Sequence, residues 1–164
     1  MSALPNKAEL LKELRALVEA DLAVITASQE EAQAGATHEE NKAEGDKDMR
    51  STEDSYLARG LAKRVTELRA SVAKLSSLAL RTFGEDAKIS LTALVEAEAE
   101  DGEILRYFVA PVGGGIVLNE ARAKVSVVTP LSPLGRALIG REVDDDVEIR
   151  TPHGTKSLCV LSIC

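Results

Sequence analysis

A crowded run of carboxylates is the part of this sequence with the clearest potential for chemistry. From Glu30 to Asp54, nine acidic residues stand against three basic ones, a charge of −6 in a chain whose formal net charge is −7. Carboxylate oxygens suit Mg²⁺, and one or two can complete the shell of a weakly held ion. The segment can equally be a solvated helix end that only favours solubility. A divalent cation or a basic channel in a partner would relieve the repulsion.

Other catalytic chemistries find little support. His38 and His153 are the only histidines that could activate a nucleophile, and neither lies in an HExxH motif. Glycines 113–115 match neither GxGxxG nor the P-loop pattern, so we interpret them as a loop. Cys159 and Cys164 lack metal-binding or redox spacing, which favours ordinary thiols in a reduced protein. We therefore do not expect intrinsic hydrolase activity, and a site built from carboxylates alone is the alternative that stays open.

Charge and composition also bear on the partner. An acidic chain is poorly suited to phosphate backbones, and two Tyr, two Phe and no Trp are too few to stack single-stranded bases. No apolar run has the length of a signal peptide or a membrane helix. We expect a cytoplasmic monomer that binds another protein, with no sequence-specific nucleic-acid binding and no membrane attachment.

Two long amphipathic helices must position the acidic run. Residues from about 5 to 80 have a helical composition, and apolar residues recur at three- and four-residue steps in two stripes. The stripes contain Leu11, Leu14, Val18, Leu22 and Ile25, and then Leu57, Leu61, Val65, Leu68, Val72, Leu75 and Leu78. This pattern predicts an antiparallel coiled-coil hairpin over residues 1–82.

The spacing of the stripes also predicts the turn. Facing residues in an antiparallel pair have numbers with a constant sum, and pairs such as Val18 with Val72 place the turn near Gly45. Asp46 follows as a good N-cap. A rival turn at Gly35 would bury charged residues against aliphatic ones, so we rank it second.

After about residue 82 the pattern changes to short strands. We predict strands at residues 88–95, 104–110, 124–129, 147–151 and 155–164. Asp101 and Gly102 predict a hairpin turn, and Ser132 and Pro133 predict the start of a short helix that ends at Gly140. Residues 83–164 should therefore form a mainly antiparallel sheet with one helix, which makes the whole chain α+β.

The end of the chain resembles a known family. Residues 132–141 (SPLGRALIGR) and 145–154 (DDVEIRTPHG) are similar in order and spacing to the C-terminal signature of the GreA and GreB transcription elongation factors. The acidic-tipped hairpin fits the same family, so the resemblance covers nearly the whole chain. It implies an FKBP-like C-terminal domain that docks on bacterial RNA polymerase.

The same resemblance implies a mechanism. The hairpin would enter the secondary channel of the polymerase, where its tip helps to hold a catalytic Mg²⁺ for cleavage of backtracked RNA. The polymerase would remain the catalyst, and the free protein would not bind the Mg²⁺ tightly. An FKBP-like fold also suggests an isomerase or chaperone. Isomerase pockets of that fold are lined with aromatic residues, whereas Tyr107 and Phe108 face opposite sides of one strand, so we disfavour this function.

The family tip, by resemblance, reads Gly-Asp, two residues, then Glu-Asn. Gly45 and Asp46 match its first half, but Met49 and Arg50 occupy the places of Glu and Asn. An alternative match at residues 40–41 would lose the first acid instead. Two functions therefore stay open, a factor that stimulates cleavage and a regulator that occupies the channel without cleaving.

The resemblance leads to two sets of candidate residues. We assign Asp46 and Asp48 as metal-directed carboxylates, with Glu44 in support. The docking candidates are Ser132, Pro133, Leu134, Gly135 and Arg136. The competing interpretation is that Leu134, Leu138 and Ile139 only anchor the helix to the sheet and that Gly135 permits close packing.

Overall fold

The computed structural model describes residues 3–41, 47–119 and 121–164. Its helices and strands follow in the order α1 (Lys7–Asn41), α2 (Lys47–Ser76), β1 (Leu94–Ala99), β2 (Ile104–Val109), β3 (Val117–Leu118), β4 (Val125–Val128), α3 (Pro133–Leu138), β5 (Asp146–Thr151) and β6 (Gly154–Ile163). They form two compact units. One comprises Arg15–Ala73, and the other combines the chain up to Leu14 with Lys74–Cys164.

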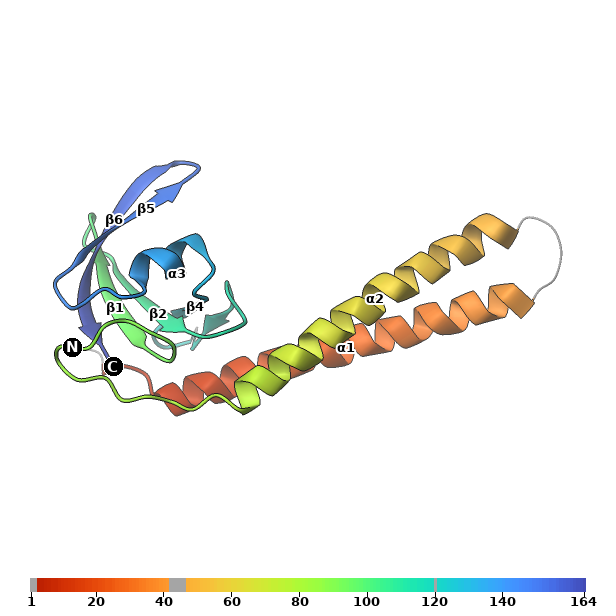
Figure 1. The fold of residues 1–164 in the computed structure, drawn as a ribbon, viewed down its shortest axis with the longest axis horizontal. Coiled ribbons are helices and arrows are strands. Elements are labelled where there is room, and N and C mark those ends of the chain that lie inside the picture. The colour runs from red at the N-terminus through yellow and green to blue at the C-terminus, as the bar shows by residue number, and fades with distance from the viewer. Residues whose placement is uncertain (1–2, 42–46, 120) are drawn as a thin grey trace. The chain divides into compact units, whose positions relative to one another are not determined.

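The unit Arg15–Ala73 is an antiparallel helical hairpin, as predicted. Figure 1 shows α1 and α2 running side by side, and Arg64 of α2 lies 3.8 Å from Asp21 of α1. Helix α1 continues through Gly35, which excludes the rival turn at that residue. Helix α1 ends at Asn41 and α2 begins at Lys47, and the predicted turn residues Gly45 and Asp46 lie outside the described residues.

The apolar seam of this hairpin is tight in one part and open in another. Val18, Val65 and Leu68 are buried, whereas Val24 is 62% exposed and Leu57 is 55% exposed. Leu57 belongs to the predicted apolar stripe, so the stripe extends farther along the sequence than the close packing does. Little hydrophobic burial stabilises the helices toward the turn.

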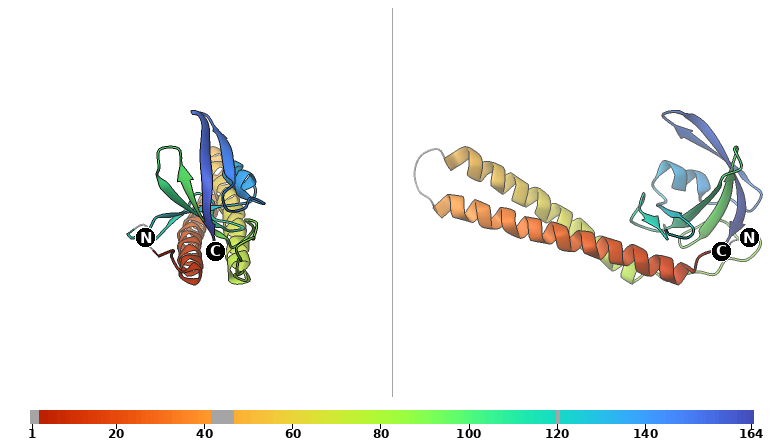
Figure 2. Two further views of the ribbon diagram at one scale, coloured as in Figure 1. Left: turned by 90° about the vertical axis from the view of Figure 1, so that its left-hand side faces the viewer. Right: turned by 180° about the vertical axis from the view of Figure 1, so that it is seen from behind.

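The second unit is built on a six-stranded sheet with the order β3-β4-β2-β1-β6-β5. All neighbouring strands are antiparallel except β2 and β4, which are parallel. Helix α3 covers one face of the sheet (Figure 2), where Leu138 joins a core that includes Tyr107, Val147 and Val160. The predicted α+β organisation is confirmed.

The first two turns of α1 belong to the sheet unit. The Lys7 ammonium donates to the carbonyl oxygens of Arg81 and Thr92, the latter at 3.1 Å, and lies 4.8 Å from the centre of the Phe83 ring. Burial lowers the pKa of the Lys7 amine. The domain ranges expected from the sequence, 1–82 for the hairpin and 83–164 for the docking domain, remain a prediction.

One predicted strand begins at the wrong place. Residues 88–93 are not a strand, because Thr92 has a φ of 72° and the amide of Ala93 donates to the carbonyl of Ser90 at 3.1 Å, which makes a turn. The strand β1 starts only at Leu94. The two-residue strand β3 was not predicted, since it is too short to show alternation.

In the described ranges, no helix combines the length and apolarity that a membrane span requires.

Candidate functional site

The segment that joins β4 to α3 is fixed by its own backbone. The Ser132 hydroxyl donates to the carbonyl of Thr129 at 2.8 Å and accepts from the amide of Gly135 at 3.0 Å. Serine is a favoured N-cap, and Pro133 has the φ that the first helical turn needs. The start of α3 is therefore tied to the end of β4.

Gly135 allows this close approach. A Cβ at this position would overlap the carbonyl oxygen of Thr129 and lie 2.9 Å from the Ser132 hydroxyl. Leu134 is partly buried against the core that Leu138 completes. Three of the predicted docking residues, Ser132, Leu134 and Gly135, thus build the segment, while the side chains of Pro133 and Arg136 are exposed.

Leu131 adds a residue that the sequence pattern did not single out. It is 78% exposed, the largest exposed fraction among the large hydrophobic residues that the structure describes. The sequence repeats Pro-Leu at 130–131 and 133–134, and only the fold distinguishes the exposed leucine from the packed one. We call residues 131–136 the docking segment. It presents an apolar side chain, Leu131, and a cation, Arg136, which makes no ion pair with any described residue.

The side chains of the predicted metal-directed residues are not among those that the structure describes. Glu44 and Asp46 lie outside the described residues, and Asp48 lies in the first turn of α2 with a side chain that is not described. The structure therefore neither brings these carboxylates together nor separates them. Within the described ranges, no group of three or more His, Cys, Asp or Glu residues is placed to hold a metal.

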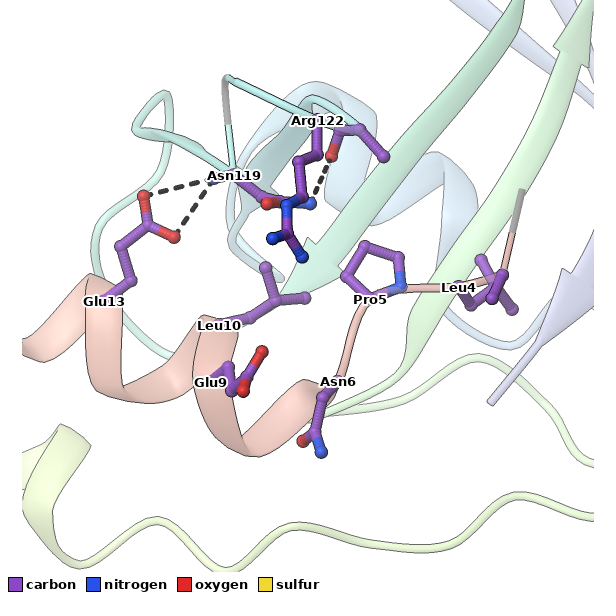
Figure 3. A pocket seen from close by; sticks show the side chains of 10 residues that line it. Leu4, Pro5, Asn6, Glu9, Leu10, Glu13, Asn119 and Arg122 are labelled. Carbon is purple, nitrogen blue, oxygen red and sulfur yellow. Dashed lines mark hydrogen bonds between the residues drawn. The ribbon is translucent and has the colours of Figure 1, made fainter.

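A cavity of about 400 Å³ lies where the start of α1 meets the β3–β4 turn. Figure 3 shows the Glu13 carboxylate directed at the backbone amide of Asn119, which donates to both of its oxygens at 3.1 Å. The Asn119 side chain donates to the carbonyl of Ala123 at 3.1 Å. Asn119 has a φ of 53°, which asparagine tolerates better than most residues. Glu13 thus holds the turn in place.

Neither cysteine is activated as a nucleophile. Burial raises the pKa of the Cys159 thiol, and the nearby carboxylates of Asp146 and Asp144 raise it further. Burial also raises the pKa of Cys164, although the Lys7 cation opposes this. A raised pKa lowers the thiolate fraction at neutral pH. These shifts agree with the expectation of ordinary thiols.

Comparison with known proteins adds an independent finding. Residues 85–164 match the family model described as the C-terminal part of transcription elongation factors GreA/GreB. The chain is 35% identical over 79 residues to the transcription elongation factor GreB of Vibrio vulnificus (strain YJ016), covering 48% of this chain and 46% of that protein. It is 41% identical over 76 residues to the GreA of Sphingopyxis alaskensis, covering 46% and 44%. The chain thus spans about half the length of these curated relatives.

Two solved structures align over more of the chain. The GreA factor homolog 1 (Gfh1) of Thermus thermophilus is 22% identical, with 92% of this chain and 94% of that chain covered and a TM-score of 0.40. The Gfh1 of Thermus aquaticus is 24% identical, with 93% and 94% covered and a TM-score of 0.41.

Proposed function

We propose that this chain is a member of the GreA/GreB family of transcription elongation factors and an accessory factor that binds bacterial RNA polymerase. The observation that carries the proposal is that one chain combines two features. Its C-terminal domain matches the family model, and its long helical hairpin has many acidic residues in the sequence around the turn. Helix α2 has 30 residues, about 45 Å at 1.5 Å per residue. The hairpin would enter the secondary channel and bring its tip to the polymerase active site.

In this proposal the tip promotes cleavage of backtracked RNA. Bound Mg²⁺ at the polymerase active site supplies activation of water for the cut. Asp46 and Asp48, supported by Glu44, would offer carboxylate oxygens to that shared ion. Their donors are all hard oxygen atoms, which fits Mg²⁺. The polymerase remains the catalyst in this arrangement, so the chain itself is not an enzyme.

The docking segment would hold the factor at the rim of the channel. Leu131 can bury apolar surface on the polymerase, and Arg136 can pair with an acidic group there. Leu131 precedes α3 and Arg136 lies within it, and the hydrogen bonds of Ser132 fix this segment, so little ordering entropy is lost on binding. These are proposed contacts on the factor's side of the interface.

The test separates binding from cleavage. The affinity of the wild-type chain and of the Asp46→Ala/Asp48→Ala variant for RNA polymerase is measured by fluorescence anisotropy, and RNA shortening is measured on backtracked complexes. We expect similar affinities and loss of shortening in the variant. Full shortening by the variant would remove Asp46 and Asp48 from the mechanism, and absence of wild-type binding would refute the whole proposal.

A non-cleaving regulator of the same channel is the second candidate. The observation that favours it is the tip sequence, in which Met49 and Arg50 stand where the family pattern has Glu and Asn. Residues 48 and 49 are consecutive in α2, and consecutive positions of an α-helix are rotated by about 100° about its axis. Asp48 is therefore not equivalent to the Glu that the family pattern has at position 49. This function predicts polymerase binding and altered elongation or initiation without RNA shortening.

A further inference from the structure

A second pocket lies on the same sheet face as α3, near the turn between β1 and β2. Its volume is about 270 Å³. Its apolar wall is formed by Leu105, Ile149 and Leu158, all of which pack on the core beneath α3. None of these residues belongs to the docking segment, and the proposed function assigns the pocket no role.

The rim of this pocket is acidic. Glu100, Asp101 and Glu103 line it from the β1–β2 turn, against a single cation, Lys156, from β6. The Asp101 carboxylate accepts from the backbone amide of Glu103 at 3.1 Å, so that group is already used within the turn. Glu100 and Glu103 form no ion pair with any residue that the structure describes. Their charge is available to a ligand.

Tyr107 gives a second, independent indication of a ligand. Its side chain is only 8% exposed and is part of the core, yet it also lines the pocket. Its phenolic oxygen makes no hydrogen bond with the described part of the chain. That oxygen is not one of the fully buried side-chain oxygens that lack a partner, so it is reachable from the pocket and can accept a hydrogen bond from a ligand. Burial, followed by the charge of Glu103, raises the pKa of Tyr107.

The turn that carries the acids is itself well ordered. The amide of Ala99 donates to the carbonyl of Glu103 at 2.9 Å, and the amide of Gly102 donates to the carbonyl of Ala99 at 2.9 Å. Gly102 has a φ of 84°, which suits glycine. The pocket is therefore preorganised, and a ligand would lose little affinity to ordering it.

We propose that this pocket binds an arginine side chain presented by a partner protein. The methylene stem of the arginine would lie on Leu105, Ile149 and Leu158. Its guanidinium, which carries five donors and no acceptor, would donate to Glu100, Glu103 and the hydroxyl of Tyr107. A guanidinium is more weakly hydrated than an ammonium, which favours arginine over lysine in a half-apolar pocket. The proposal does not depend on the identity of the partner.

The test uses the full chain and a pair of matched peptides. Acetyl-Gly-Arg-Gly-amide is titrated into ¹⁵N-labelled protein, and the same peptide with citrulline, a neutral analogue of arginine, is the control. We expect saturable amide shifts confined to residues 99–107, 149 and 156–158 with the arginine peptide alone. Equal shifts with both peptides, shifts elsewhere or no shifts would overturn the proposal.

Variants then identify the groups involved. Glu103→Gln should weaken binding of the arginine peptide roughly threefold or more, since it removes one exposed charge. Tyr107→Phe should weaken it as well, while it keeps the ring in the core. Glu148→Gln changes an exposed acid of β5 outside the pocket and should leave the affinity unchanged. Unchanged binding by both pocket variants would also refute the proposal.

Discussion

A Cβ atom at Gly135 would overlap the carbonyl oxygen of Thr129, so the start of α3 can approach the end of β4 only through a glycine. This relationship explains a glycine inside a helix, where it would otherwise be unfavourable. It also links a signature residue to the geometry of the docking segment.

The first prediction concerns that contact. Gly135→Ala should lower the free energy of unfolding by at least about 2 kcal/mol, because the backbone must shift to admit a methyl group. Gly84→Ala is the matched control, since a Cβ there meets no atom within 4 Å. Its effect should stay within about 1 kcal/mol. Urea unfolding compares the two, and similar stabilities would contradict the packing argument.

Leu131 should matter for binding and not for folding. With its side chain 78% exposed, Leu131→Ser should change the free energy of unfolding by less than about 0.5 kcal/mol. Affinity for RNA polymerase should fall about tenfold, as expected when an apolar anchor is lost. Leu80→Ser, at a leucine outside the docking segment, is the control in the same anisotropy assay. Equal affinity of wild type and Leu131→Ser would remove this residue from the interface.

The Glu13 contact gives a third prediction. Glu13→Ala leaves the part-buried amide of Asn119 without its acceptor and should cost about 1 to 2 kcal/mol in urea unfolding. Glu9→Ala removes another acid that lines the same cavity and should cost less than about 0.5 kcal/mol. Hydrogen exchange at the Asn119 amide should quicken only in the first variant. If both variants behave alike, the contact does not hold the turn.

Tyr107 predicts a loss of stability in alkali. Its pKa in the folded protein is raised above the ordinary value of 10.0 by burial and by Glu103, so the unfolded chain ionises first. The contribution of Tyr107 to the free energy of unfolding is therefore fully present below pH 10. It is lost as the pH rises from there toward the pKa of Tyr107 in the folded protein. Tyr107→Phe should therefore show a flatter fall of unfolding free energy with pH. Tyr56→Phe, at a residue 66% exposed, should retain the wild-type slope, and an unchanged slope in both would contradict the assignment.

Much of the fold follows from patterns that depend on local chemistry. Ser132 and Pro133 have strong preferences for the start of a helix, and Asp101 with Gly102 for a hairpin turn, so both features were predicted and confirmed. The error at residues 88–93 has the opposite origin. Thr92 adopts a positive φ, which a β-branched residue rarely does, and tertiary contacts overrode its preference for strands.

The sites were less accessible to sequence reasoning. The docking role of Ser132–Arg136 and the metal-directed role of Asp46, Asp48 and Glu44 stay predictions. Leu131 and Tyr107 were not identified as site residues because the exposure of one leucine and the burial of one tyrosine depend on the folded arrangement. Neither exposure nor burial can be read from the sequence pattern, whereas a run of acidic residues near a predicted turn is visible in the sequence itself.

The most direct measurement is the length of the RNA in a backtracked elongation complex, with Mg²⁺ present, followed over time with and without this protein. The account predicts that the protein accelerates loss of a fragment from the 3′ end of the RNA. RNA of unchanged length, under conditions where the factor is bound to the polymerase, would contradict the cleavage function and leave only occupation of the channel.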